Sequence, residues 1–121
     1  MTDLNIPANL VSIILNKQVS SKSTWVITIS NEEKLLNYKL LDNSVAMINY
    51  YHFLYLCDKY IVDKGYGVNI LENERGTGLV LSKGGLIQKN FSSENKEDCI
   101  IEATLWVIQN NKIKSNKKEI A

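Results

Sequence analysis

The chain has 121 residues, of which 45% are hydrophobic and 22% charged, the balance of an ordinary globular protein. Its 14 Lys and Arg residues nearly cancel its 13 Asp and Glu residues. The net charge of +1 excludes a strongly basic nucleic-acid coat and a strongly acidic mimic of DNA. This length suits one domain with its own core, so we expect a single domain over residues 1–111 and a Lys-rich flexible tail at residues 112–121.

Several kinds of segment are missing from the sequence. No apolar run approaches the 18 residues of a membrane span, and the first residues show no basic segment followed by an apolar one. Cys57 and Cys99 are too few for a disulfide framework, and both stand among apolar residues in helical patterns. We expect two reduced core thiols in a cytoplasmic protein; a bridge between them or a reactive thiol is the alternative.

The N-terminal part, residues 1–43, is expected to be rich in strands. Residues 9–15 are apolar and β-branched; Pro7 before them favours a helix, whereas the composition favours a strand, and we expect the strand. Residues 18–23 form a polar loop. Residues 24–30 alternate with a period of two and predict a strand, and residues 35–41 predict the strand that returns beside it.

The pattern then changes to that of a helix. Residues 44–64 hold neither Gly nor Pro, follow N-cap candidates at residues 42–44 and end before Gly65, so they predict the longest helix. Three strands follow, at residues 66–71, 77–82 and 86–91, with a hairpin signal at Gly84 and Gly85. A last helix, capped by Ser92 or Ser93, runs to about Asn111.

These elements predict an α+β protein in the order β(β)β-α-βββ-α, in which a group of strands followed by a helix occurs twice. The simplest arrangement is one mostly antiparallel sheet with both helices packed on one face. Residues 1–43 would form its β-rich part and residues 44–111 its α-βββ-α part.

The long helix is apolar around more than half of its circumference. One stripe predicts its core face, and it consists of Met47, Tyr50, Leu54, Cys57 and Ile61. Tyr51, Tyr55 and Val62 flank this stripe, and they are our candidate partner-binding residues. Packing of the helices on each other would also cover such a flank. Because Tyr buries a large area and keeps a polar tip, we expect a homodimer or a protein partner.

Candidate chemistry is sparse. His52 is the single histidine and stands on the polar strip of the long helix, so neither a metal cage nor a His-based catalytic pair is expected. The glycines lack the spacing of phosphate-binding loops, and we expect no cofactor and no enzymatic activity. Arg75 and Lys83 flank two turns of the strand meander and form a weak candidate anion-binding pair. The lysines of residues 112–118 predict either contact with phosphates or a solubilising tail.

Two resemblances follow from these motifs. The order helix, three strands, helix over residues 44–111 is similar to that of the double-stranded RNA-binding domain. That family carries basic residues at the start of its last helix, where this chain has the acidic segment 93–98, which points away from RNA. The residues Met47-Ile48-Asn49-Tyr50-Tyr51-His52-Phe53, Cys57, Gly65-Tyr66, Ile101-Glu102-Ala103 and Trp106-Val107-Ile108 resemble short uncharacterised proteins of phages and prophages.

The second resemblance implies a phage or mobile-element accessory protein in the cytoplasm of a bacterial host. Together with the apolar helix flank, it leads us to expect a small non-enzymatic protein that binds and sterically inhibits a host protein, such as a CRISPR effector or another defence component. A nucleic-acid-binding module that uses the α-βββ-α segment and the Lys tail, or a sponge for a small molecule or nucleotide, is the alternative.

Overall fold

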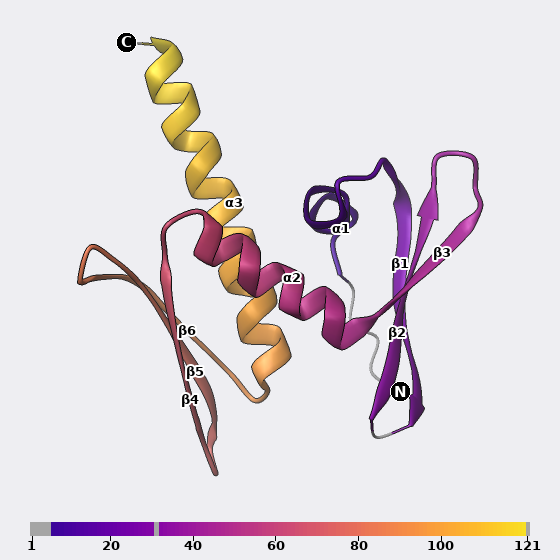
Figure 1. The fold of residues 1–121 in the computed structure, drawn as a ribbon, viewed down its shortest axis with the longest axis horizontal. Helices are drawn as coiled ribbons and strands as arrows, with labels where there is room; N and C mark the ends of the chain where they lie inside the picture. Colours follow the sequence, from indigo (N-terminus) through magenta and orange to yellow (C-terminus); the bar gives the residue numbers. More distant parts are fainter. Residues whose placement is uncertain (1–5, 31, 121) are drawn as a thin grey trace. The chain divides into compact units, whose positions relative to one another are not determined.

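The computed structural model describes the backbone of residues 6–30 and 32–120 and, within these ranges, all side chains except those of residues 21–23 and 112–120. The described chain contains three helices and six strands in the order α1-β1-β2-β3-α2-β4-β5-β6-α3 (Figure 1). All strand pairs are antiparallel, which confirms the α+β class. The expected single sheet is wrong, because the strands form two three-stranded sheets, β1-β2-β3 and β4-β5-β6.

The chain divides into two compact units, residues 1–56 and residues 57–121. The boundary falls inside α2 (Tyr50–Asp63). Each unit contains a meander of three consecutive strands, and a helix follows each meander along the chain. The arrangement of strands followed by a helix therefore occurs twice, as the sequence predicted.

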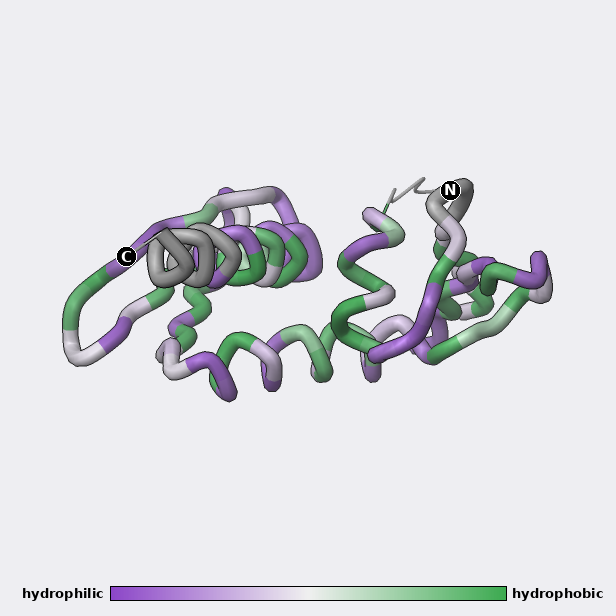
Figure 2. The backbone as a smooth tube through the Cα atoms, turned by 90° about the horizontal axis from the view of Figure 1, so that it is seen from above, coloured by the Kyte–Doolittle hydropathy of each residue, from purple (hydrophilic) through white to green (hydrophobic). Residues whose placement is uncertain are grey.

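The first unit begins with the helix α1 (Ala8–Leu15), where we expected a strand. Pro7 stands at the N-cap, and its carbonyl accepts hydrogen bonds from the N–H groups of Leu10 and Val11. Pro7 therefore starts a helix, and this local signal overrides the weak strand preference of the β-branched residues. α1 is apolar over most of its length (Figure 2), and its Leu10 and Val11 are completely buried.

The first sheet contains β1 (Val19–Ser30), β2 (Glu33–Leu40) and β3 (Val45–Asn49). β1 begins five residues earlier than expected, so the predicted loop at residues 18–23 is mostly strand. Leu36 and Tyr38 of β2 are buried, and α1 contacts β1. The Thr24 hydroxyl donates a hydrogen bond to the Ile6 carbonyl, which ties the start of the chain to the sheet.

The helix predicted from residue 44 begins only at Tyr50, because residues 45–49 form β3 instead. Asn49 caps the helix, since its side-chain oxygen accepts a hydrogen bond from the N–H of His52 (3.1 Å). Met47 therefore does not belong to the helical core stripe and is 62% exposed, whereas Tyr50, Leu54, Cys57 and Ile61 are buried as predicted.

The second unit has the predicted meander, with β4 (Gly67–Asn73), β5 (Gly76–Lys83) and β6 (Leu86–Ser93). α3 (Lys96–Ile120) contacts β5 and β6 and buries Cys99, Ala103 and Val107. Its backbone continues nine residues past the expected end at Asn111. The lysine side chains of the predicted tail lie outside the described residues.

Candidate protein-binding surfaces

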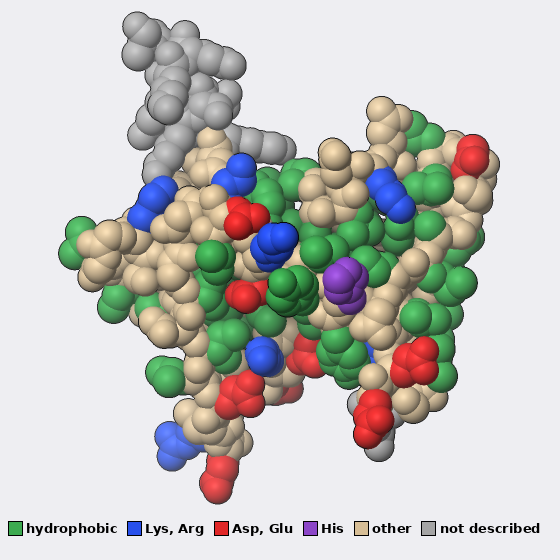
Figure 3. All heavy atoms as spheres, in the orientation of Figure 1, with side chains coloured by type: hydrophobic (Ala, Val, Ile, Leu, Met, Phe, Trp, Pro, Cys, Tyr) green, Lys and Arg blue, Asp and Glu red, His purple; other side chains and the backbone are tan. Residues whose placement is uncertain are grey.

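Tyr51 and Tyr55 lie one turn apart on α2, and both belong to the first unit. Their side chains are 38% and 60% exposed. The Tyr55 ring stacks on the His52 ring, with 6.1 Å between the centroids and 18° between the planes. The space-filling view shows the single histidine, in purple, beside exposed hydrophobic side chains (Figure 3). Stacking limits the rotamers of Tyr55 while leaving most of its ring in contact with water.

Val62, the third residue of the predicted partner-binding flank, is 53% exposed on the part of α2 that belongs to the second unit. The exposure of all three side chains leaves the predicted flank free for contact. The carbonyl of Val62 accepts a hydrogen bond from the N–H of Gly65 (2.9 Å), where the helix ends.

The first sheet carries a second apolar surface, which the sequence analysis did not single out. The strand register places Ile27 opposite Leu35, and Trp25 opposite Asn37, which in turn faces Met47. These residues share the face opposite to the one that holds the buried Leu36. Nine residues form this face, which we call the outer face of the first sheet: Trp25, Ile27, Glu33, Leu35, Asn37, Lys39, Val45, Met47 and Asn49. Asn37, in its middle, is buried.

The alternation in β1 reveals how unusual this face is. The larger apolar side chains of residues 24–30 are those of Trp25, Ile27 and Ile29, and a strand with one buried face normally turns such residues inward. Here Thr24 is buried on the inner side, whereas Ile27 and Ile29 are 45% and 55% exposed. The signal was present in the sequence as a clean period of two, but the period alone does not say which face meets the core.

The outer face of the second sheet provides an internal contrast. Paired positions there combine Asn69 with Val80 and Asn90, and Leu71 with Gly78 and Ser92. Most of these side chains are small or polar, which is typical of a solvated face of an antiparallel sheet.

The candidate anion-binding residues Arg75 and Lys83 lie at opposite ends of β5, a strand that spans roughly 23 Å at a rise of about 3.3 Å per residue. Arg75 occupies the turn between β4 and β5, where its N–H donates a hydrogen bond to the Asn73 side chain (2.8 Å). Lys83 stands near the start of the β5–β6 hairpin. The fold does not bring these two cations together.

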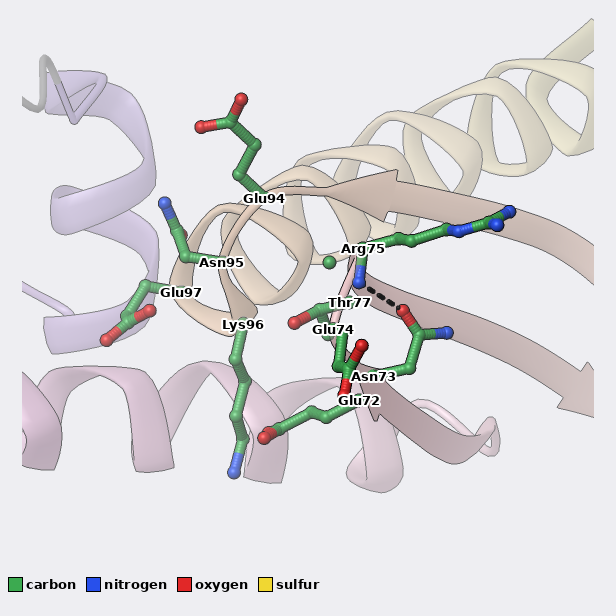
Figure 4. Close-up of a pocket in the computed structure, with 10 residues that line it drawn as sticks. Glu72, Asn73, Glu74, Arg75, Thr77, Glu94, Asn95, Lys96 and Glu97 are labelled. Carbon is green, nitrogen blue, oxygen red and sulfur yellow. Dashed lines mark hydrogen bonds between the residues drawn. The ribbon is translucent and has the colours of Figure 1, made fainter.

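An open hollow of about 690 Å³ lies beside Arg75, between the β4–β5 turn and the start of α3. Figure 4 shows that the Arg75 side chain points away from Glu94 and Glu97. The lining contains four carboxylates, those of Glu72, Glu74, Glu94 and Glu97, and two cations, those of Arg75 and Lys96. This excess of negative charge opposes the binding of phosphate.

Lys83 instead has a structural role in the second unit. Its Nζ lies 4.8 Å from the centroid of the Tyr66 ring, and the ring of Trp106 meets that of Tyr66 edge to face at 5.9 Å. The Tyr66 hydroxyl accepts a hydrogen bond from Asn110 Nδ2 (2.9 Å). Tyr66 thus joins the end of the sheet to α3 through three different contacts, and it is nearly completely buried.

Both cysteines are free and buried, as predicted. Burial raises the pKa of the Cys57 thiol to about 12, although a hydrogen bond with Thr104 opposes this rise. Burial also raises the pKa of Cys99, whose Sγ donates to the Thr77 carbonyl (3.5 Å), and the carboxylates of Glu102 and Asp98 add to the rise. Both groups are therefore protonated and poor nucleophiles at neutral pH.

Two features are absent from the described part of the chain. Within it, no three His, Cys, Asp or Glu side chains are grouped so that they could hold a metal ion. None of its helices has the length and apolar character needed to cross a membrane. Comparison with protein-family models, curated proteins and solved structures finds no match for this chain.

Proposed function

We propose that this chain is a small non-enzymatic protein that binds another protein through the exposed tyrosines of α2. The observation that carries this proposal is the pair formed by Tyr51 and Tyr55, one helical turn apart and open to solvent. An aromatic ring with a hydroxyl tip buries a large apolar area on binding and still satisfies its polar end, so tyrosine is enriched where proteins meet. A helix that presents such side chains at a spacing of four fits an apolar groove on a partner.

The arrangement of His52 supports the same use. Its ring stacks on Tyr55 and restricts that side chain before binding. Little conformational entropy is then lost when the partner closes over the ring, which favours affinity.

The partner class comes from the resemblance to short phage and prophage proteins. On that ground we propose a host protein as the target and steric blocking as the mechanism, with a defence component such as a CRISPR effector as the specific candidate. No catalytic step is required of this chain, because occupying the partner's surface is sufficient for inhibition.

The test compares Tyr51→Ala/Tyr55→Ala with a matched control, Leu71→Ala/Leu86→Ala, which removes two exposed apolar side chains from the second unit. Each tagged protein is incubated with a bacterial lysate, and a protein retained by wild type is purified and titrated by isothermal titration calorimetry. We expect the tyrosine variant to bind at least tenfold more weakly and the control to bind like wild type. Circular dichroism checks that both variants are folded. Equal affinity of wild type and a folded tyrosine variant would exclude this surface.

A further inference from the structure

The outer face of the first sheet points to a second binding surface, independent of the tyrosine pair. We infer that a second copy of this chain packs against it, sheet on sheet, to form a symmetric dimer. Ile27, Val45 and Met47 are 45–62% exposed on this face, and Trp25 and Leu35 are partly exposed beside them.

The first argument is the inverted alternation of β1. Thr24 and Val26 face the core side, while Trp25 and Ile27 face away from it. An antiparallel sheet with one solvated face carries polar side chains there, as the second sheet of this chain does. Apolar residues on both sides of a strand are expected when both faces of its sheet are covered.

The second argument is the net charge of the outer face, which favours a second copy of this chain over a strongly charged partner. Of the nine described residues on this face, Glu33 and Lys39 are charged, and their opposite charges cancel. A two-fold axis brings a surface against a copy of itself, so a face with a strong net charge would meet the same net charge. A nearly neutral face avoids this repulsion, and the net charge of +1 adds little repulsion between whole chains.

The third argument is area, which sets the expected strength. Three strands spaced about 4.8 Å apart and about seven residues long present a face of roughly 300 Å² in projection. Stable complexes bury about 800 Å² of accessible surface on each partner, and accessible surface exceeds the projected area of a corrugated face. The dimer is therefore expected at the weak end of the range, with a dissociation constant in the micromolar region.

The test is sedimentation velocity from about 5 to 500 μM for wild type and three variants. Met47→Lys places a charge on the face, Ile27→Thr removes apolar area while keeping a β-branched residue, and Leu71→Lys is the control on the second sheet. We expect wild type and Leu71→Lys to dimerise alike, and Met47→Lys and Ile27→Thr to dimerise at least tenfold more weakly. Far-UV circular dichroism identifies any variant that fails to fold, and the other face variant then decides the result.

Three results would overturn the inference. Wild type that stays monomeric up to 500 μM would assign the face to another occupant, such as a different protein. Dimerisation of folded Met47→Lys with the wild-type constant would place the contact elsewhere. An equal loss in Leu71→Lys would indicate a general effect of added charge. Failure of the tyrosine test leaves this result unaffected, because Tyr51→Ala/Tyr55→Ala is expected to dimerise like wild type.

Discussion

The buried thiol of Cys57 makes the stability of the second unit depend on pH in a way that can be calculated. Its pKa rises from an ordinary value of 9.0 to about 12 because the folded chain excludes water from it. Unfolded chains release this proton above pH 9, whereas the folded chain retains it until pH 12. The stabilisation is therefore complete below pH 9 and is lost as pH rises towards 12. At pH 10 the free energy of unfolding is lower than at pH 7 by about 1.4 kcal/mol from this thiol alone.

Urea unfolding at pH 7, 8, 9 and 10 measures this effect, with Cys57→Ala as the comparison. The variant loses packing energy equally at every pH, since alanine does not titrate. We expect wild type to lose about 1.4 kcal/mol more than the variant between pH 8 and pH 10. Cys99 and all other titrating groups are present in both proteins, so their contributions cancel. Parallel curves for the two proteins would show that Cys57 is not held in its protonated form by burial.

Three further experiments test the packing inside each unit. Gly76→Ala places a Cβ only 2.6 Å from a backbone oxygen at a φ of +142°, whereas Gly84→Ala meets open space at a φ of +60°. In thermal unfolding we expect Gly76→Ala to lower the free energy of unfolding by more than about 2 kcal/mol and Gly84→Ala to lower it by about 1 kcal/mol. Asn110→Ala removes the hydrogen bond to Tyr66, so we expect it to lower the free energy of unfolding by about 1 kcal/mol. Tyr66→Phe removes the same bond, so the double variant should lose no more free energy of unfolding than either single variant does. Leu36→Ala opens a cavity at a completely buried site and is expected to cost about 3–5 kcal/mol in urea unfolding, so a loss below 1 kcal/mol would contradict its place in the core.

The second unit was more predictable from sequence than the first, and the reason is local. Four of its six glycines have a positive φ at or beside turns: Gly65, Gly76, Gly84 and Gly85. Gly65 marks the end of α2 to within two residues. Strands between such breaks have few alternative boundaries. The N-cap of α3 is Asn95, whose side chain accepts a hydrogen bond from the N–H of Asp98, rather than the expected Ser92 or Ser93. Neighbouring residues with equal capping ability explain that shift.

The first unit was harder because its signals compete. The segment Val45–Asn49 contains no helix breaker and leads directly into a helix, so helical and strand readings both fit it. Pairing with β2 decides in favour of the strand, and only the fold reveals that pairing. Asn49 could have marked the true start, but Asp42 and Ser44 offered capping groups as well. They bond to each other instead, since the N–H and hydroxyl of Ser44 donate to the Asp42 carboxylate, which lowers its pKa.

The exposed apolar residues admit a simpler explanation, which the proposed variants separate from docking. Units of 56 and 65 residues bury a smaller share of their surface than larger domains do, so some apolar side chains remain outside for lack of core. That effect acts on both units alike, and Leu71 of the second is as exposed as Met47 of the first. If the exposure reflects only the small size of the core, lysine at Met47 and lysine at Leu71 should change self-association equally. Docking predicts that lysine weakens self-association only at Met47, because Met47 lies on the outer face of the first sheet, whereas Leu71 lies opposite Gly78 on the outer face of the second sheet.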